Sequence, residues 1–222
     1  MIYLLEAFHW SQLLQPQYYI ENGGLWLLLL VVFAETGLFF GFFLPGDSLL
    51  FVAGIYSDLL AGQIVVTHNQ WLDLLIIFAF IATAGILGNY VGYYIGKKVG
   101  PAMYDWKENI FFKKKYLVQA QEFYEKHGGS AIVIARFIPI VRTFAPIVAG
   151  IVQMDKKKFV YFNIVGSIAW VASMLCAGHF LQKWILDQFH FDLKKHLEVI
   201  VLGIVFITTL PVIIKVITHK SK

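Results

Sequence analysis

Long apolar stretches separated by short polar segments run through the whole chain. A helix needs about 20 apolar residues to span a bilayer, and three stretches meet this requirement without interruption. We predict spanning helices over residues 72–96, 159–182 and 197–218. The pattern therefore predicts an all-α integral membrane protein, with residues 1–222 as a single membrane domain.

A fourth apolar stretch, residues 24–56, is long enough to span the bilayer but is interrupted. Glu35 lies inside it, glycines loosen it, and Pro45-Gly46-Asp47 separates it from a short second apolar run. A Pro-Gly pair marks a turn, and broken helices at membrane depth are typical of transporters. We predict two half-helices that meet at this turn as a re-entrant hairpin.

A fifth stretch, residues 130–152, is apolar but carries two arginines and two prolines. Pro139 and Pro146 each remove a backbone donor and disfavour helix at the residue before them. Irregular backbone is tolerated within a membrane only where protein buries it or it lines a cavity. We therefore predict a second re-entrant hairpin over this stretch.

Three polar segments complete the pattern. Within the N-terminal segment 1–20, residues 1–15 mix apolar and polar positions and predict an interfacial amphipathic helix, which Pro16 is expected to end. Residues 58–70 predict a polar loop. Residues 103–128 contain three consecutive lysines before a helical pattern, which predicts a helix on the cytoplasmic membrane surface.

The glycines of the predicted 72–96 helix recur every three or four residues and predict close contact with other helices: Gly85, Gly88, Gly92 and Gly96. Gly100-Pro101 is expected to end that helix.

The two halves of the chain share an order of elements that suggests an inverted repeat. Phe51-Val52-Ala53-Gly54-Ile55 aligns with Ile147-Val148-Ala149-Gly150-Ile151, and each run ends a predicted hairpin that precedes a spanning helix. If the lysine-rich loops are cytoplasmic, the hairpins enter from opposite sides and the C-terminus is cytoplasmic. Inverted repeats with broken helices bind their substrate between the halves, near the midplane.

Composition agrees with a membrane protein and excludes several functions. The chain is 59% hydrophobic and 14% charged, whereas soluble domains are about 45–50% apolar. The net charge of +4 comes from lysines in short loops, so no nucleic-acid binding is expected. The single cysteine, Cys176, excludes an internal disulfide framework. The histidines lack metal-ligand spacing, so no metal or cofactor is expected.

Arg136 and Arg142 are the strongest candidates for chemistry. An arginine at the bilayer centre costs roughly 2.5 to 3.5 kcal/mol on insertion scales, so each needs a partner, a cavity or a polar ligand. Guanidinium forks suit phosphate oxygens better than lysine does. Six residues apart, the two side chains would diverge by about 120° on a regular helix, so Pro139 must break the helix if they converge on one headgroup. The alternative is that both arginines snorkel from helix ends.

Glu35 and Asp47 are the candidate partners of these arginines. We hypothesise an exchange in which phosphate and carboxylate compete for the guanidiniums, and protonation of a carboxylate frees them for lipid. The alternative is that both carboxylates hold the hairpins to the arginines permanently, and Asp47 has the further alternative of capping the half-helix after it. His179 is a weaker candidate for a proton-relay residue, and His127 is expected to lie at the membrane interface.

These residues resemble the signature of a known family. Glu35 with Pro45-Gly46-Asp47, and the run Arg136-Phe137-x-Pro139-x-x-Arg142-Thr143 followed by Ala149-Gly150, look like the DedA family, also called the SNARE-associated or VTT-domain family. The likeness covers roughly residues 24–181, and the acidic pair, the arginine pair and both Ala-Gly endings occur in the expected order.

The resemblance implies a multi-pass protein of the bacterial inner membrane with two opposed re-entrant hairpins. It also implies translocation of a lipid carrier, notably the return of undecaprenyl phosphate across the membrane, driven by the proton motive force. By position, Glu35, Asp47, Arg136 and Arg142 match the family's essential charged residues. The implied partners are polyprenyl phosphate, anionic phospholipids, and protons or sodium ions for coupling.

Other functions stay open on the residues alone. A general phospholipid scramblase would use the same hairpins without ion coupling, and a proton-coupled transporter of small molecules or ions would use the carboxylates. A lipid phosphatase would need a nucleophile, a general-base histidine or a metal cluster beside the arginines. None is evident in the sequence, so an enzyme is not expected. A homo-oligomer is left open.

Overall fold

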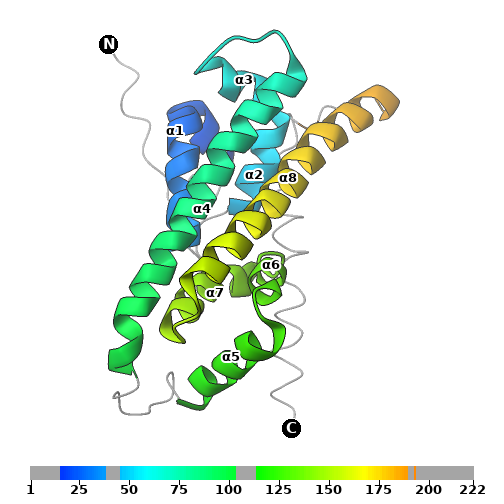
Figure 1. Ribbon diagram of the computed structural model, residues 1–222. Coiled ribbons are helices and arrows are strands. Elements are labelled where there is room, and N and C mark those ends of the chain that lie inside the picture. Colours follow the sequence, from blue (N-terminus) through cyan, green and yellow to red (C-terminus); the bar gives the residue numbers. More distant parts are fainter. Residues whose placement is uncertain (1–15, 39–45, 104–113, 190–192, 194–222) are drawn as a thin grey trace, which may run out of the picture. The chain divides into compact units, whose positions relative to one another are not determined.

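The computed structural model describes residues 16–38, 46–103, 114–189 and 193. Helices account for most of these residues, as predicted, and they follow one another in the order labelled in Figure 1: α1 (Pro16–Gly37), α2 (Gly46–Ile55), α3 (Ser57–Gly62), α4 (Gln70–Met103), α5 (Lys114–His127), α6 (Ser130–Ala135), α7 (Pro139–Ile151) and α8 (Lys156–Phe189). The predicted spanning helix over 197–218, Pro45 and most of the predicted N-terminal helix over 1–20 lie outside the described residues.

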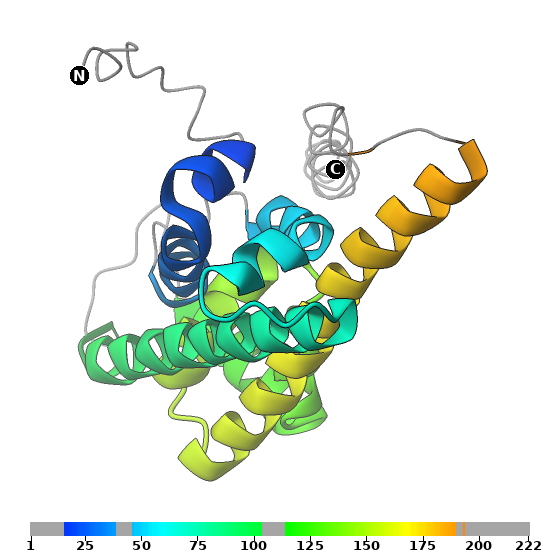
Figure 2. The same ribbon diagram turned by 90° about the horizontal axis from the view of Figure 1, so that it is seen from above.

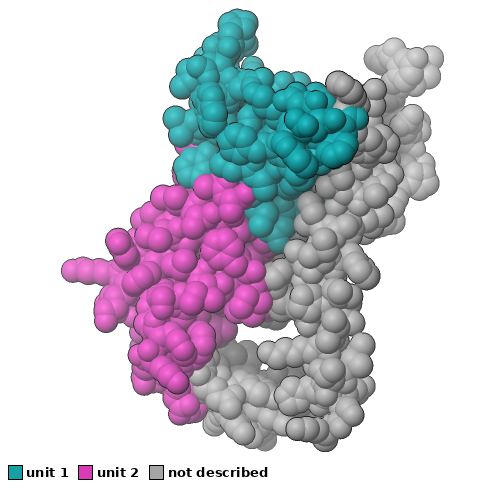
Figure 3. All heavy atoms as spheres, turned by 90° about the vertical axis from the view of Figure 1, so that its right-hand side faces the viewer, with its two compact units in different colours: residues 1–29, 44–78, 174–222 teal, residues 30–43, 79–173 magenta. Residues whose placement is uncertain are grey.

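The chain divides into two compact units, which Figure 3 shows in different colours. Unit 1 consists of residues 1–29, 44–78 and 174–222, and unit 2 consists of residues 30–43 and 79–173. Helices α1, α4 and α8 each contribute a segment to both units. The two buried arginines and Glu35 belong to unit 2, whereas Asp47 belongs to unit 1.

Among the described helices, α4 and α8 are long and apolar enough to cross a membrane. Both are longer than predicted. The expected end at Gly100-Pro101 is wrong, because α4 continues through Pro101 to Met103. Gly100 lies against the backbone of Ile151, so packing extends beyond the predicted end of the helix. Helix α8 begins early because the Asp155 side chain accepts a hydrogen bond from the Lys158 backbone N–H at 2.9 Å, which caps its first turn.

The first interrupted stretch forms short helices rather than one spanning helix. The apolar segment of α1 covers residues 23–37, and α2 covers Gly46–Ile55. Neither reaches the length of about 20 residues that a spanning helix needs. This agrees with the two predicted half-helices, while their fold as a re-entrant hairpin stays a prediction.

Two local features of unit 1 differ from the predictions. Helix α1 is kinked at Gly24, which has a positive φ of 55°, and the side chain of Gln63 accepts a hydrogen bond from the Leu25 N–H at 2.9 Å. The polar loop predicted over 58–70 begins instead with helix α3, because Leu60 and Ala61 are fully buried and hold this turn in place.

Within unit 1, α2 packs closely against the C-terminal half of α8, and the two lie side by side in Figures 1 and 2. A Cβ atom on Gly54 would collide with the backbone carbonyl of Leu175, and one on Gly178 would collide with that of Phe51. Gly54 therefore lies inside a helix and sets a helix contact rather than a turn.

In unit 2, local stereochemistry shapes the chain from α5 to α7. Helix α5 ends at His127. The next residue, Gly128, has a positive φ of 59° and an N–H bond to the Tyr124 carbonyl, which are typical of a glycine after a helix. Helix α6 ends at Ala135, and Ile138 is extended, with φ −111° and ψ 108°, because it precedes a proline. Helix α7 then starts at Pro139. The predicted break is present at this proline.

Pro146 does not interrupt helix α7, and the expectation that it would disrupt the helix is wrong. It lies inside α7, where it is buried against α4, with a Cβ built on Gly92 only 3.6 Å from its own Cβ. Packing of this kind compensates for the backbone hydrogen bond that the proline removes. The α6–α7 segment therefore has one interruption, between Arg136 and Ile138.

The glycines of α4 make the close contacts predicted for them. A Cβ on Gly96 would collide with the carbonyl of Ile147 on α7, and one on Gly150 would collide with the carbonyl of Tyr93 on α4. A Cβ on Gly88 would likewise collide with the Phe33 carbonyl and the Thr36 hydroxyl of α1. Gly85 is less tightly packed, because a Cβ there would have its nearest neighbour at 3.9 Å. Gly150, like Gly54, is thus a helix contact inside a helix. The matching roles of these two glycines support the inverted repeat, which stays a prediction.

Candidate functional site

Three ionisable side chains are buried together in the part of unit 2 that the structure describes. Glu35 is 1% exposed, Arg136 is 2% exposed and Arg142 is 7% exposed. They come from α1, from the residue that caps α6, and from α7. Protein atoms cover both guanidinium groups, which argues against arginines that snorkel to an interface.

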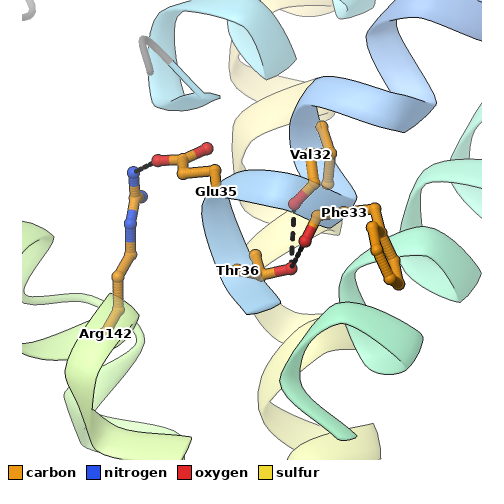
Figure 4. Close-up of polar contacts among 5 residues, drawn as sticks. All are labelled: Val32, Phe33, Glu35, Thr36 and Arg142. Carbon is orange, nitrogen blue, oxygen red and sulfur yellow. Dashed lines mark hydrogen bonds and ion pairs between the residues drawn. The ribbon is translucent and has the colours of Figure 1, made fainter. Parts of the chain in front are cut away.

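Arg142 forms an ion pair with Glu35. Its Nη2 donates a hydrogen bond to Glu35 Oε1, and Figure 4 shows the two side chains reaching toward each other from α7 and α1. The neighbouring Thr36 does not join them, because its hydroxyl donates to the Val32 carbonyl of its own helix at 2.8 Å (Figure 4). The pairing of Glu35 with one arginine, expected from the sequence, is therefore present.

Arg136 has neutral partners instead. Its Nη2 donates to Asn163 Oδ1 at 2.9 Å and to Ser167 Oγ at 2.6 Å, both on α8. Its buried Nε has no hydrogen-bond partner among the described residues. Gly166 lies between the two acceptors, and a Cβ there would be only 3.3 Å from Arg136 Cγ. The absence of a side chain at Gly166 thus lets the stem of Arg136 pass close to α8.

Asn163 joins Arg136 to helix α4. Its Oδ1 accepts a second hydrogen bond, from Asn89 Nδ2 at 2.7 Å, and its own Nδ2 donates to the Ile86 carbonyl at 3.1 Å. Ser167 Oγ donates to the Asn163 backbone carbonyl at 2.7 Å. These bonds fix the orientation of the Asn163 amide, so that its oxygen faces the guanidinium.

Trp170 lies beside both arginines. Its ring centroid is 5.6 Å from Arg136 Cζ and 4.9 Å from Arg142 Cζ, and the side chain is fully buried. A guanidinium within about 6 Å of an indole is attracted by the negative face of the ring. One aromatic side chain therefore contacts two like charges and helps to keep them close together.

The predicted Asp47 lies in the first turn of α2, where a carboxylate is favourable to the helix dipole. Because it belongs to unit 1, its pairing with an arginine stays a prediction. Gly46, the first residue of α2, is buried.

The two histidines singled out from the sequence have local partners. His127 Nδ1 lies 3.0 Å from the Phe123 carbonyl on α5. His179 Nδ1 lies 3.5 Å from Ser57 Oγ in unit 1. Among the described residues, no three His, Cys, Asp or Glu side chains are grouped so that they could hold a metal ion.

Sequence reasoning missed the polar face of α8. Asn163, Ser167 and Trp170 are separated by four and three residues, so they lie on one face of the helix. The signal was available, because a polar side chain inside an apolar span usually faces the protein interior and marks a function. Asn89 in α4 is a further example of the same signal.

The arrangement combines two buried cations with one buried carboxylate. A buried charge is costly unless it is paired and hydrogen-bonded. The Glu35 carboxylate neutralises one of the two guanidiniums, so within this cluster of three the net charge is +1 while Glu35 is ionised. The cluster can therefore accept an anion.

Comparisons with known proteins show that the chain is similar to membrane proteins. The VTT domain matches residues 23–180. The chain is 38% identical over 204 residues to "Protein DedA" of Escherichia coli K12, covering 90% of this chain and 87% of that protein. It is 36% identical over 208 residues to "Uncharacterized membrane protein Rv0364" of Mycobacterium tuberculosis H37Rv, covering 91% and 85%.

A more distant relative is "Inner membrane protein YqjA" of Escherichia coli K12, which is 32% identical over 159 residues, covering 71% of this chain and 67% of that protein. No solved structure matches the chain. The matched region contains the buried cluster, all of α4 and α8 as far as residue 180, so the similarity covers the parts of the chain from which the candidate site is built.

Proposed function

This chain belongs to the DedA family of VTT-domain membrane proteins, and from that premise we propose that it moves a phosphate-bearing lipid across its membrane. The proposed substrate is undecaprenyl phosphate, the lipid carrier that is recycled in cell-envelope synthesis. The proposed location is the bacterial inner membrane, with several spanning helices and a cytoplasmic C-terminus. Transport would depend on the proton motive force, and no chemical conversion of the lipid is proposed.

The observation that carries this proposal is the pair of buried arginines, of which Arg142 is paired with the carboxylate of Glu35. A phosphate monoester carries a charge of about −1.5 to −2 at neutral pH. Arg136 and Arg142 together match this charge once Glu35 is neutral. Guanidinium groups hold phosphate oxygens through parallel hydrogen bonds, and the shared contact with Trp170 keeps the two groups near each other.

The ion pair suggests how transport could be coupled to protons. In the structure Glu35 forms an ion pair with Arg142. Protonation of Glu35 would remove this competing anion and leave Arg142 able to bind the lipid phosphate. Loss of the proton on the other side of the membrane would restore the ion pair and expel the phosphate. Asp47 is proposed to take part in the same exchange, and the prenyl chain would stay in the bilayer throughout.

The test is transport of labelled undecaprenyl phosphate in liposomes that contain the purified protein, with and without an imposed pH gradient. We expect movement that depends on the gradient, that is lost in Arg136→Ala and that is strongly reduced in Arg142→Lys, because lysine cannot form two parallel hydrogen bonds. Lys157→Ala is the matched control, since this cation is exposed at the start of α8.

Each alternative has its own result in the same assay. Equal movement of ordinary phospholipids without a gradient would indicate a general scramblase. Gradient-dependent proton flux without lipid movement would indicate a transporter of small molecules or ions. Full activity of Arg142→Lys would contradict the two-point binding of phosphate.

A further inference from the structure

The two buried arginines differ in their partners. Arg142 is bonded to a carboxylate, whereas Arg136 is bonded to an amide oxygen and a hydroxyl. We propose that Asn163 is a positioning residue, which holds Arg136 with a neutral acceptor so that the guanidinium charge remains available to a lipid phosphate. This inference rests on the proposed function, and it gives the two arginines different roles. Arg136 keeps its charge available to phosphate at all times, whereas Arg142 binds either Glu35 or phosphate.

The position of Arg136 is set by bonds on three sides of Asn163. The amide oxygen accepts from Arg136 and from Asn89 of α4 at 2.9 and 2.7 Å, and the amide nitrogen donates to the Ile86 carbonyl at 3.1 Å. Rotation of the amide would place its nitrogen against two donors and its oxygen against a carbonyl. The acceptor that Arg136 uses is therefore held in place by α4.

The remaining donors of Arg136 are suited to a ligand. Its Nη2 is occupied by Asn163 and Ser167, while its Nε is buried without a partner among the described residues. Buried donors are normally satisfied, and an unsatisfied one in a native protein requires an explanation. A phosphate oxygen beside Arg136 would supply the missing acceptor and, at the same time, the missing negative charge.

The identity of residue 163 is then a matter of charge rather than of size. Aspartate has nearly the same shape as asparagine and would also accept from Arg136. Its carboxylate would form an ion pair with the guanidinium, as Glu35 does with Arg142, and would compete with phosphate for Arg136. A protein that only needed Arg136 held in place would function with either residue, but a protein that needs the charge of Arg136 would function only with the neutral one.

The test compares Asn163→Asp, Asn163→Ala and the wild-type protein in detergent micelles. Two quantities are measured: the melting temperature, and the affinity for labelled undecaprenyl phosphate. We expect Asn163→Ala to lower both. We expect Asn163→Asp to keep its melting temperature near the wild-type value and to bind the lipid at least about tenfold more weakly, which corresponds to the loss of about one charge-assisted hydrogen bond. If Asn163 only held Arg136 in place, Asn163→Asp would leave both quantities near the wild-type values or lower both together.

Asn69→Asp is the matched control, because it makes the same chemical change away from the cluster. Asn69 caps α4 by accepting from the Trp71 N–H at 2.9 Å, and aspartate is an equally good cap. Both quantities should stay at the wild-type values.

A second pair of variants keeps the inference testable if Asn163→Asp does not fold, since its second carboxylate oxygen would face the Ile86 carbonyl. Ser167→Asp places a carboxylate at the other acceptor of Arg136, and Ser167→Ala removes that acceptor without adding charge. We expect Ser167→Asp to weaken lipid binding much more than Ser167→Ala does.

Binding by Asn163→Asp or Ser167→Asp at the wild-type affinity would overturn the inference. Wild-type protein that binds the lipid but does not move it in liposomes would contradict the proposed transport and leave the role of Asn163 standing. Wild-type protein that binds no undecaprenyl phosphate would overturn both.

Discussion

The Glu35–Arg142 ion pair should make a large and measurable contribution to stability. Both side chains are almost fully buried, at 1% and 7% exposure. When one partner of a buried pair is removed, the other is left as an uncompensated charge, which costs about 3–5 kcal/mol. Arg142 and Arg136 both lie beside the Trp170 ring, so Glu35→Ala would leave two buried positive charges close together without this carboxylate. We therefore expect the cost of this variant to lie at the upper end of that range.

The two single substitutions should not be equivalent. Arg142→Ala leaves a carboxylate that can take up a proton and become neutral, whereas a guanidinium stays charged at every accessible pH. We expect Arg142→Ala to cost less than Glu35→Ala, and to cost less at pH 5 than at pH 8. The double variant Glu35→Ala/Arg142→Ala has no unpaired charge from this pair, so it should be more stable than Glu35→Ala alone.

The measurement is a double-mutant cycle on the free energy of unfolding, determined by reversible denaturation in mixed micelles. An interaction energy of about 3 kcal/mol is expected. The control cycle uses Gln121 and Glu125, whose exposed side chains are bonded at 2.9 Å one turn apart on α5; its interaction energy should stay below about 0.5 kcal/mol. The reasoning is refuted if each single variant at the buried pair costs less than about 1 kcal/mol and the effects simply add.

Three further predictions follow from other contacts. Gly150→Ala should cost about 1–3 kcal/mol because its Cβ collides with the Tyr93 carbonyl, while Gly62→Ala, with no atom within 4 Å, should change unfolding by less than about 0.5 kcal/mol; equal effects would contradict the close contact. Trp170→Leu should weaken lipid binding and cost about 1–4 kcal/mol from two cation–π contacts, whereas the exposed Trp184→Leu should have little effect on either quantity. Burial raises the pKa of the Tyr124 phenol, whose hydroxyl donates to the Ala145 carbonyl at 2.9 Å. The stability that this neutral phenol contributes is therefore present below about pH 10 and is lost above it. A denaturation series at increasing pH should show this loss in the wild-type protein and not in Tyr124→Phe.

Features with a local cause were predictable from the sequence. The break before Pro139 follows from the backbone restriction that a proline places on the residue before it, and Ile138 is extended for that reason. The glycine spacing of α4 likewise follows from the need of two helices to approach closely. Glu35 and the two arginines were recognisable because charge in an apolar stretch is costly and therefore marks a candidate site.

Features that depend on contacts distant in sequence were not predictable in this way. Pro101 was expected to end a helix and Pro146 to interrupt one. Helices α4 and α7 instead continue past these prolines, where the two helices pack closely against each other. The partners of Arg136 lie 27 and 31 residues further along the chain. Their polar character was visible in the sequence, but nothing local indicates which of the two arginines they would reach.

The unequal partners of the two arginines bear directly on how the proposed site would both bind and release a phosphate. If carboxylates neutralised both guanidiniums, as in a purely structural network, two anions would have to leave before a phosphate could bind. If neither were paired, the empty site would hold two uncompensated charges, and release of the phosphate would be too costly. With Arg136 held by neutral acceptors and Arg142 held by Glu35, a single protonation changes the charge of this cluster from +1 to +2. In the proposed mechanism, that single change would alternate between a site that binds a phosphate monoester and one that releases it.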